Sequence, residues 1–328
     1  MSLYRREDAL GKNVVSIYSP EKSVSVYEHD YWWSDSWDPL RYGKGYDFSK
    51  TFFQQFHELL NSVPLPSVFA SNVVQSPYVN HVGYLKNCYL TFASWQAENV
   101  SYASHVINVK ESVDVLTTNN SEWCYDTIDC DKCLRVVFSQ DCNGCLESAF
   151  LYDCKNCSNC LGCVGLRNKQ YHILNKPYSK EDYIQKKNKI WDTPESLAEF
   201  KAAFEQLKIQ FPRRFGRLVN AVNTTGDHVS NVKSCTNCFD FVGPVENSKY
   251  VAFGGLNLND SYDGYGVGAV CEMLYEGIDS GEQASREKFS VVVYSSKNTD
   301  YCFCCSSSSY LFGCIGLRNK QYCILNKQ

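Results

Sequence analysis

Residues 130–157 read CDKCLRVVFSQDCNGCLESAFLYDCKNC, and this stretch decides the fold. It contains a Cys-x2-Cys pair in each 12-residue module, and an aspartate directly precedes each pair. Further out, every third residue from Val82 to Cys163 is small or aliphatic, without a charged, aromatic or amide side chain. All the cysteines of the first half of the chain fall in this frame. A period of three differs from the period of two in a β-strand and from that of 3.6 in an α-helix.

The period of three predicts a narrow β-solenoid, in which short strands and tight corners turn a small residue inward at every third position. The predicted fold class is therefore mainly β, with two tandem narrow β-solenoid (β-helix) units and short flanking α-helices. Four inward residues in each 12-residue module resemble the repeat of the beetle antifreeze β-helix. The outward threonine ladder on which ice binding depends is absent here. A 24-residue coil, as in larger right-handed β-helices, is the alternative.

The chain contains an internal duplication. CVGLRNKQYHILNK at residues 163–176 returns as CIGLRNKQYCILNK at residues 314–327. A weaker match relates Phe52 and Phe56 to Phe200 and Phe204, and the second pair belongs to a predicted helix that begins after Thr193. The predicted domains are a Trp-rich segment, then a helix, solenoid and basic cap, then a second such set. Their boundaries are 1–50, 51–192 and 193–328.

The second half repeats the triplets less regularly. Its frame opens at Val232, Cys235 and Cys238 and closes in another phase around Cys302 to Cys314. We therefore expect insertions around residues 264–281 to form a loop there. Since loops carry binding more often than the scaffold beneath them, divergent function is expected in that loop.

Outward residues of the first solenoid sort into apolar rows that follow the 12-residue module, and something must cover them. The cover would be the solenoid's own helix, the other half, a second subunit or a protein partner, so we expect protein binding or self-association through this face. One row is Tyr89, Ser101, Val113, Tyr125, Val137, Ala149 and Leu161, and the next is Phe92, Ser104, Leu116, Ile128, Gln140, Tyr152 and Val164.

Composition and motifs limit the function. A net charge of −4 in 328 residues provides no general basic field for nucleic acid, which is therefore a less favoured partner. The chain has no apolar run long enough to span a membrane and no signal peptide, so we expect a cytoplasmic location with reduced thiols. G-x-S-x-G, Walker and H-E-x-x-H motifs are absent. The leading prediction is a non-catalytic binding or scaffold protein. The only hint of a glycan lyase is the aspartate run Asp129, Asp141 and Asp153.

Two groups of residues are candidate binding sites, and each also has a purely structural explanation. Cys154, Cys157, Cys160 and Cys163 resemble the iron–sulfur run of bacterial ferredoxins, although the last spacing and the following proline differ. Buried thiols acting as small hydrophobic residues are the favoured explanation, so no cofactor is expected, and zinc or a cluster is the alternative.

The duplicated GLRNKQY segments form the second candidate site. They could contact phosphate or nucleic acid, or they could cap the exposed edge of the last coil, which is the favoured explanation. The candidate residues are Arg167, Lys169, Tyr171, Arg318, Lys320 and Tyr322.

WWSDSWDPL at residues 32–40, YGKGYDFS at residues 42–49 and the GLRNKQY-ILNK segments resemble an uncharacterised cysteine-rich repeat family of candidate-phyla bacteria. Some members are labelled CoA-transferases, and no residue here supports that chemistry. The resemblance implies an N-terminal zinc ribbon. Here Glu28 and Tyr31 stand where the cysteine pair would be, so a degenerate ribbon would rely on Glu28, His29 and Asp30. The resemblance also implies a capping helix beyond Gln328.

Overall fold

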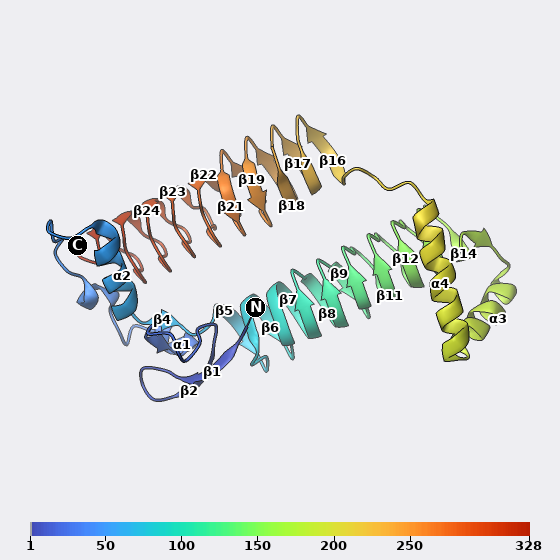
Figure 1. Ribbon diagram of the computed structural model, residues 1–328, viewed down its shortest axis with the longest axis horizontal. Coiled ribbons are helices and arrows are strands. Elements are labelled where there is room, and N and C mark those ends of the chain that lie inside the picture. The colour runs from blue at the N-terminus through green and yellow to red at the C-terminus, as the bar shows by residue number, and fades with distance from the viewer. Residues whose placement is uncertain (1) are drawn as a thin grey trace. The chain divides into compact units, whose positions relative to one another are not determined.

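The computed structural model describes residues 2–328 and is mainly β (Figure 1). Its contacts divide the chain into two compact units. Unit 1 consists mainly of Val68–Arg213, and unit 2 mainly of Tyr18–Ser67 with Arg214–Gln328. Short N-terminal segments are shared between them. Among the described residues, no helix has the length and apolar character needed to cross a membrane.

Unit 1 is built on a sheet of parallel strands, with one antiparallel pair at its end. Its register follows the 12-residue module, as in the pairing of Tyr125 with Val137 and of Leu146 with Ser158. The module read from the sequence predicts this register, and a 24-residue coil does not. The strands are β5 (Ala70–Val74), β6 (Val79–Lys86), β7 (Tyr89–Ser104), β8 (Ile107–Leu116), β9 (Asn119–Glu122), β10 (Tyr125–Ile128), β11 (Leu134–Gln140), β12 (Leu146–Tyr152), β13 (Ser158–Val164), β14 (Gln170–Ile173) and β15 (Lys176–Pro177).

The backbone of unit 1 turns at every third residue. From His81 to Leu174 each third residue is left-handed, with φ between 46° and 69°. Asn, Asp and Gly adopt this conformation readily, whereas bulky residues such as Trp123 and Phe138 do so at roughly 1 kcal/mol each. A chain that turns after each triplet comes back into register after four triplets, which accounts for the 12-residue pairing.

The residue that follows each left-handed corner points into the core. Every third residue from Val82 to Cys163 is buried, as the sequence frame predicts. The buried hydroxyls are satisfied by the main chain. For example, Ser94 Oγ donates to the Phe92 carbonyl at 2.6 Å and accepts from the Val106 N–H at 3.2 Å, one repeat further on. Small polar side chains therefore fill this core without losing hydrogen bonds.

Helices α3 (Lys180–Trp191) and α4 (Pro194–Gln210) follow the sheet of unit 1. The predicted helix after Thr193 is confirmed, and Thr193 caps it through a hydrogen bond from the Ser196 N–H. Phe200 and Phe204 are buried against Phe150 and neighbouring residues of β12 and β13. The contacts therefore assign α4 to unit 1, whereas the predicted division at residue 193 placed it with the second solenoid.

Unit 2 contains the second parallel sheet and most of the N-terminal segment. The sheet strands are β16 (Leu218–Val222), β17 (Gly226–Lys233), β18 (Cys238–Glu246), β19 (Lys249–Ala252), β20 (Leu258–Asn259), β21 (Tyr262–Tyr265), β22 (Cys271–Tyr275), β23 (Ser285–Lys288), β24 (Lys297–Asp300), β25 (Ser309–Phe312) and β26 (Gln321–Ile324). The N-terminal elements are β1 (Tyr4–Glu7), β2 (Asn13–Ser16), β3 (Val26–Tyr27), α1 (His29–Trp33), the 3-10 helix η1 (Pro39–Tyr42), α2 (Phe52–Ser62) and β4 (Leu65–Pro66).

Residues 264–281 do not form the predicted loop. They belong to 13-residue repeats, in which Leu258 pairs with Cys271 and Glu272 with Ser285. The extra residue is absorbed beside a glycine, where two consecutive residues such as Ala269 and Val270 are left-handed. The prediction was wrong because one added residue per repeat shifts the triplet frame without interrupting strand pairing.

Helix α2 packs on the end of the unit 2 sheet. The centroid of the Phe52 ring lies 4.6 Å from that of the Phe312 ring. The Phe52 ring also occupies the position where a side chain at Gly313 would begin, and Phe200 does the same at Gly162 in unit 1. These glycines correspond to each other in the duplication. Unit 2 thus receives its helix from the segment that precedes unit 1.

The 13-residue repeat of unit 2 predicts a strict glycine requirement at Gly281. A Cβ there would overlap the Gly268 carbonyl oxygen of the previous repeat, whereas a Cβ at Gly277 would meet only Val267 Cγ1 at 3.4 Å. Gly281→Ala should lower the free energy of unfolding by about 1–3 kcal/mol. Gly277→Ala is the matched control and should change it much less. Urea denaturation measures both, and equal stability of the two variants would contradict the register.

Candidate functional site

Cys154, Cys157, Cys160 and Cys163 occupy the inward positions of a single 12-residue repeat. All four are fully buried. Each thiol donates to a main-chain carbonyl, as from Cys154 Sγ to Cys163 O and from Cys157 Sγ to Lys155 O, both at 3.4 Å. All 18 cysteines of the chain are buried free thiols. Their hydrogen bonds to the backbone identify them as core residues.

The thiols also hydrogen-bond one another, and these contacts shift their pKa values in opposite directions. The pKa of Cys154 is raised by its hydrogen bond with Cys157 and by burial, and that of Cys160 by Cys157, Cys163 and burial. The pKa of Cys157 is lowered because it accepts from Cys145, Cys154 and Cys160. The pKa of Cys163 is lowered as well, by its hydrogen bond with Cys160.

The cysteine row is not arranged as a preformed tetrahedral metal site. Four sulfurs around a zinc ion at about 2.3 Å would lie about 4 Å from one another. Within residues 2–328, no three cysteine sulfurs lie mutually within 4.8 Å. The thiols follow the turn of the backbone, and a metal would have to rearrange them.

Arg167 is held by its own unit. Its guanidinium donates to Asp153 Oδ1 at 2.8 Å, to the Asp153 carbonyl and to the Leu166 carbonyl at 3.0 Å. Lys169 is exposed, and Tyr171 packs on Tyr183 with 5.6 Å between the ring centroids. These contacts are those of a cap on the last repeat.

Arg318 is the duplicate of Arg167 and is held by different partners. It donates to the carbonyls of Trp33 at 2.5 Å and Ser34 at 3.0 Å, and its guanidinium lies 5.5 Å from the Trp32 ring centroid. Burial lowers its pKa. A phosphate would have to displace both carbonyls from this arginine.

The two other cap candidates of unit 2 differ in exposure. Lys320 is half-buried, and its N–H donates to Ser308 Oγ at 3.1 Å. Tyr322 is exposed and stacks on Tyr310 at 5.0 Å.

The Trp-rich segment covers the end of unit 2. Trp32 is buried and donates from Nε1 to the Pro64 carbonyl at 2.9 Å, and Trp37 donates to the Trp32 carbonyl at 2.7 Å. Of the residues suggested for a degenerate zinc ribbon, Glu28 caps α1 by accepting from the Tyr31 N–H, and His29 and Asp30 begin that helix. The predicted boundary at residue 50 therefore separates segments that pack in one unit.

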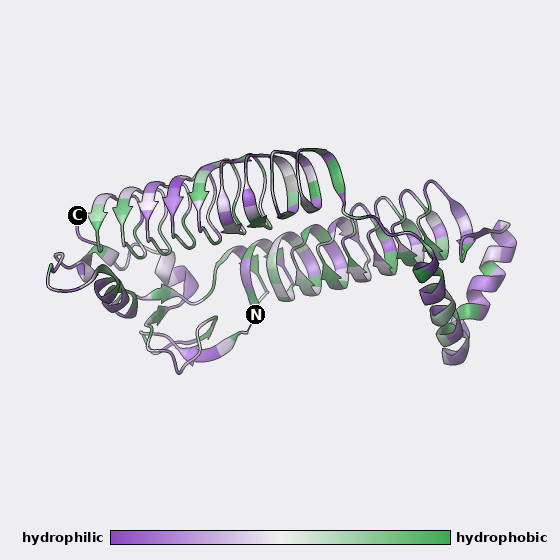
Figure 2. Ribbon diagram, turned by 45° about the horizontal axis from the view of Figure 1, so that its top comes forward, coloured by the Kyte–Doolittle hydropathy of each residue, from purple (hydrophilic) through white to green (hydrophobic). Residues whose placement is uncertain are grey.

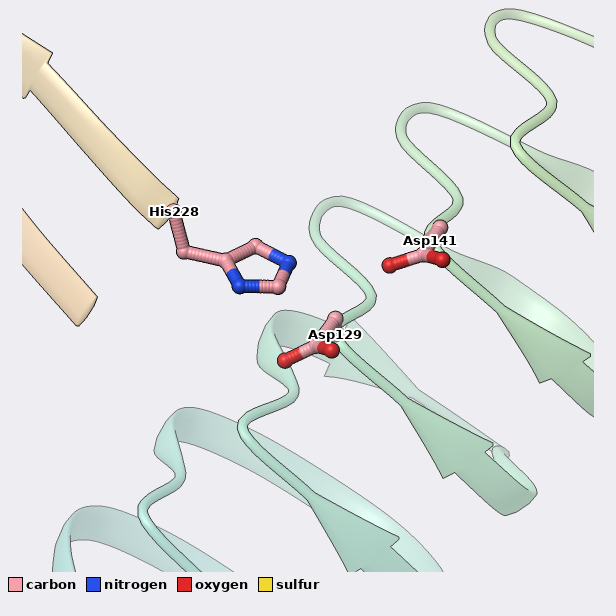
Figure 3. A group of neighbouring side chains, drawn as sticks. All are labelled: Asp129, Asp141 and His228. Carbon is pink, nitrogen blue, oxygen red and sulfur yellow. The ribbon is translucent and has the colours of Figure 1, made fainter. Parts of the chain in front are cut away.

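The aspartate run follows successive repeats of unit 1. Figure 3 shows Asp129 and Asp141 at equivalent corners of neighbouring repeats. Asp153, the third member, is engaged by Arg167. His228, also drawn in Figure 3, belongs to β17 of unit 2, where its Nδ1 lies 3.6 Å from Asp240 Oδ1. These residues do not form the paired acid and base of a lyase groove within either unit.

Unit 2 contains a buried carboxyl group that sequence reasoning missed. Glu287 is 1% exposed and occupies an inward position, paired with Leu274 and Thr299 in the neighbouring strands. Its oxygens face the hydroxyls of Ser280 and Thr299, without a hydrogen bond of ordinary geometry among the described residues. Burial raises the pKa of Glu287 to about 8. Its triplet position would have revealed it once the 13-residue register was known.

An apolar groove of about 520 Å³ lies on unit 1. Its floor is part of the predicted row 92, 104, 116, 128, 140, 152 and 164, here called the Leu116 row. One side is the corner row 90, 102, 114, 126, 138 and 150, here called the Asp114 row. Figure 2 shows hydrophobic and hydrophilic stretches following one another along the repeats of the chain. The lining residues are Leu90, Phe92, Tyr102, Ala103, Ser104, Asp114, Val115, Leu116, Asp126, Thr127 and Ile128.

Helix α4 covers the other end of the same two rows. Val164 and Phe150 are buried beneath it, whereas Leu116 is 43% and Ile128 is 37% exposed. The sequence predicted an apolar row that needs a cover. The structure shows that the chain's own helix covers only the last repeats of that row.

The fold and the groove together define a parallel β repeat protein with a thiol-lined core and one partly open apolar face. No protein-family model matches the chain, and no curated protein matches it. One solved structure that is similar to part of it is a provisionally described acetyltransferase from Desulfovibrio desulfuricans G20, 9% identical over 76% of this chain and 69% of that chain. Its TM-score of 0.15 carries no argument about fold or activity.

The raised pKa of Glu287 predicts that unit 2 loses stability with rising pH. Unfolding returns the carboxyl to its ordinary pKa of 4.5, so between that value and about 8 only the unfolded chain releases the proton. The free energy of unfolding should fall by about 1.4 kcal/mol per pH unit in this interval. Glu287→Gln should remove the slope, measured by urea denaturation at several pH values. Parallel slopes for both proteins would contradict the assignment.

The contacts of Arg318 predict a structural role that can be separated from phosphate binding. Arg318→Ala should lower the free energy of unfolding by about 1–2 kcal/mol, because the hydrogen bonds of the guanidinium to two main-chain carbonyls and its packing on the Trp32 ring are lost. Lys320→Ala is the neighbouring control and should have little effect. Thermal melts with and without inorganic phosphate provide the readout. A wild-type protein stabilised by phosphate through Arg318 would favour the binding role instead.

Proposed function

We propose that this chain is a non-catalytic cytoplasmic binding or scaffold protein, built on two cysteine-lined β-solenoids. The observation that supports it best is the uncovered length of the Leu116 row in unit 1. Apolar members of the row lie beneath α4, as Val164 does, and again beyond it at the exposed residues Leu116 and Ile128, with Gln140 between the two stretches. An apolar surface that extends beyond its own covering helix is typical of a binding surface.

The solenoid interpretation is supported by the register and the corners. Parallel pairing follows a 12-residue repeat in unit 1 and both 12-residue and 13-residue repeats in unit 2, and a left-handed residue precedes each inward one. Such a repeat makes a long, regular surface from few residue types. A scaffold uses that regularity, because equivalent positions of successive repeats present the same chemistry.

The alternatives have less support. Zinc or an iron–sulfur cluster at Cys154, Cys157, Cys160 and Cys163 would have to displace thiols that already donate to backbone carbonyls. Phosphate or nucleic acid at the caps would compete with the partners of Arg167 and Arg318. The family resemblance remains a prediction, and the CoA-transferase label of some family members finds no support in these residues.

A displayed-peptide selection on the purified protein tests the proposed function. Enriched peptides should bind the wild-type chain and lose at least tenfold in affinity to Leu116→Asp, because a charge on the floor of the groove disfavours apolar burial. Leu134→Asp changes a similarly exposed leucine outside the groove and is the matched control. Peptides that bind the wild type and Leu116→Asp equally would contradict a binding role for this face, as would a selection that enriches none.

A further inference from the structure

The groove of unit 1 lies on the same two rows of residues on which helix α4 packs. Strand pairing places Leu116 beside Ile128, Ile128 beside Gln140, and Tyr152 beside Val164, so the Leu116 row runs unbroken from the groove to the helix. The contacts that α4 makes are therefore a guide to what the open part of the same two rows can hold.

Helix α4 uses two kinds of contact. Phe200 and Phe204 lie with their ring centroids 5.6 and 6.1 Å from that of Phe150. Lys201, on the same helix, holds its ammonium 5.3 Å from the Phe138 centroid and 5.6 Å from that of Phe150. Phe150 and Phe138 belong to the Asp114 row, so both the apolar ridge of α4 and Lys201 contact that row, and Val164 of the Leu116 row lies in the same buried cluster.

The corner row changes character inside the groove. Asp126 and Asp114 stand one and two repeats before Phe138, at the next two corners of the Asp114 row. Both aspartates are exposed, and the described residues that line the groove include no basic side chain. A lysine in the place of Lys201 would meet a carboxylate there instead of a ring, which is a stronger partner for a cation.

Helices α2 and α4 of this chain already pack on other surfaces. Phe200 and Phe204 of α4 are buried in unit 1, and α2 packs through Phe52 on unit 2. The groove is therefore open to a helix from another protein, and the two aspartates specify the charge of that helix.

We propose that the groove binds an amphipathic helix of a partner protein, with its apolar ridge on Phe92, Leu116 and Ile128 and its lysines or arginines against Asp114 and Asp126. This inference rests on the proposed function and names the class of its partner. Helix-in-groove binding of this kind is read through apolar anchors three or four residues apart.

Two labelled peptides test this. One has the sequence of α4, PESLAEFKAAFEQLKIQ, and the other has lysine in place of Ala198 and Glu205, one turn on either side of Lys201. Fluorescence anisotropy should show the basic peptide binding at least tenfold more tightly than its parent. The difference should shrink as salt is raised, because exposed charges are screened.

Variants of the protein distinguish the charged contact with Asp114 and Asp126 from the apolar contact with Leu116. Asp114→Asn with Asp126→Asn should cost the basic peptide at least tenfold in affinity and the parent less, because the parent has Lys201 but no lysine at positions 198 and 205. Leu116→Asp should weaken both peptides. Asp263→Asn, at an exposed left-handed corner of unit 2, is the matched control and should change neither. Thermal melts of each variant establish that it is folded.

The outcomes are distinguishable from failure of the proposed function. If both peptides bind equally and Leu116→Asp abolishes both, the face binds helices but the basic class is wrong. If neither peptide binds while the selected peptides still need Leu116 for binding, the proposed binding face is supported and the proposal that it binds a helix is wrong. If the basic peptide ignores Leu116→Asp, its binding is nonspecific charge attraction and the inference fails.

Discussion

The narrowness of the interior is the constraint on which the rest of the structure depends. In unit 1, a chain that turns at every third residue leaves room inside for side chains about the size of cysteine, serine, threonine, valine or leucine. The thiols and hydroxyls then bond to carbonyls of their own and the following repeat, so polar atoms in the core cost little. The left-handed corners are the cost of this geometry, and the backbone hydrogen bonds between successive repeats offset it.

The same constraint explains why cysteine is so frequent here. A thiol is small and apolar enough for the core and still donates weakly to a carbonyl, so it suits an inward position better than most residues. Rows of neighbouring thiols arise because equivalent positions stack, without any need for a ligand. Cysteine-rich sequences in such repeats therefore resemble metal-binding motifs for a reason that is purely geometric.

Much of unit 1 could be predicted because its pattern is local. The triplet frame from Val82 to Cys163 identified the buried residues, and the stripe of Phe200 and Phe204 identified α4. The middle of unit 2 could not be predicted in the same way. One extra residue per repeat, next to Gly268 or Gly281, moves the frame without leaving a turn signal. The burial of Glu287 was hidden for the same reason.

The sequence does not predict which unit each helix packs on, since the duplication places a helix before each cysteine-rich repeat region without indicating which region the helix covers. Helix α2 and the tryptophan segment precede unit 1 in the chain yet pack on the final repeats of unit 2. During synthesis, these residues leave the ribosome well before their packing partners in unit 2 and must wait for them. Their contacts span almost the whole chain, so loop closure over that length should make this docking the slow step of folding.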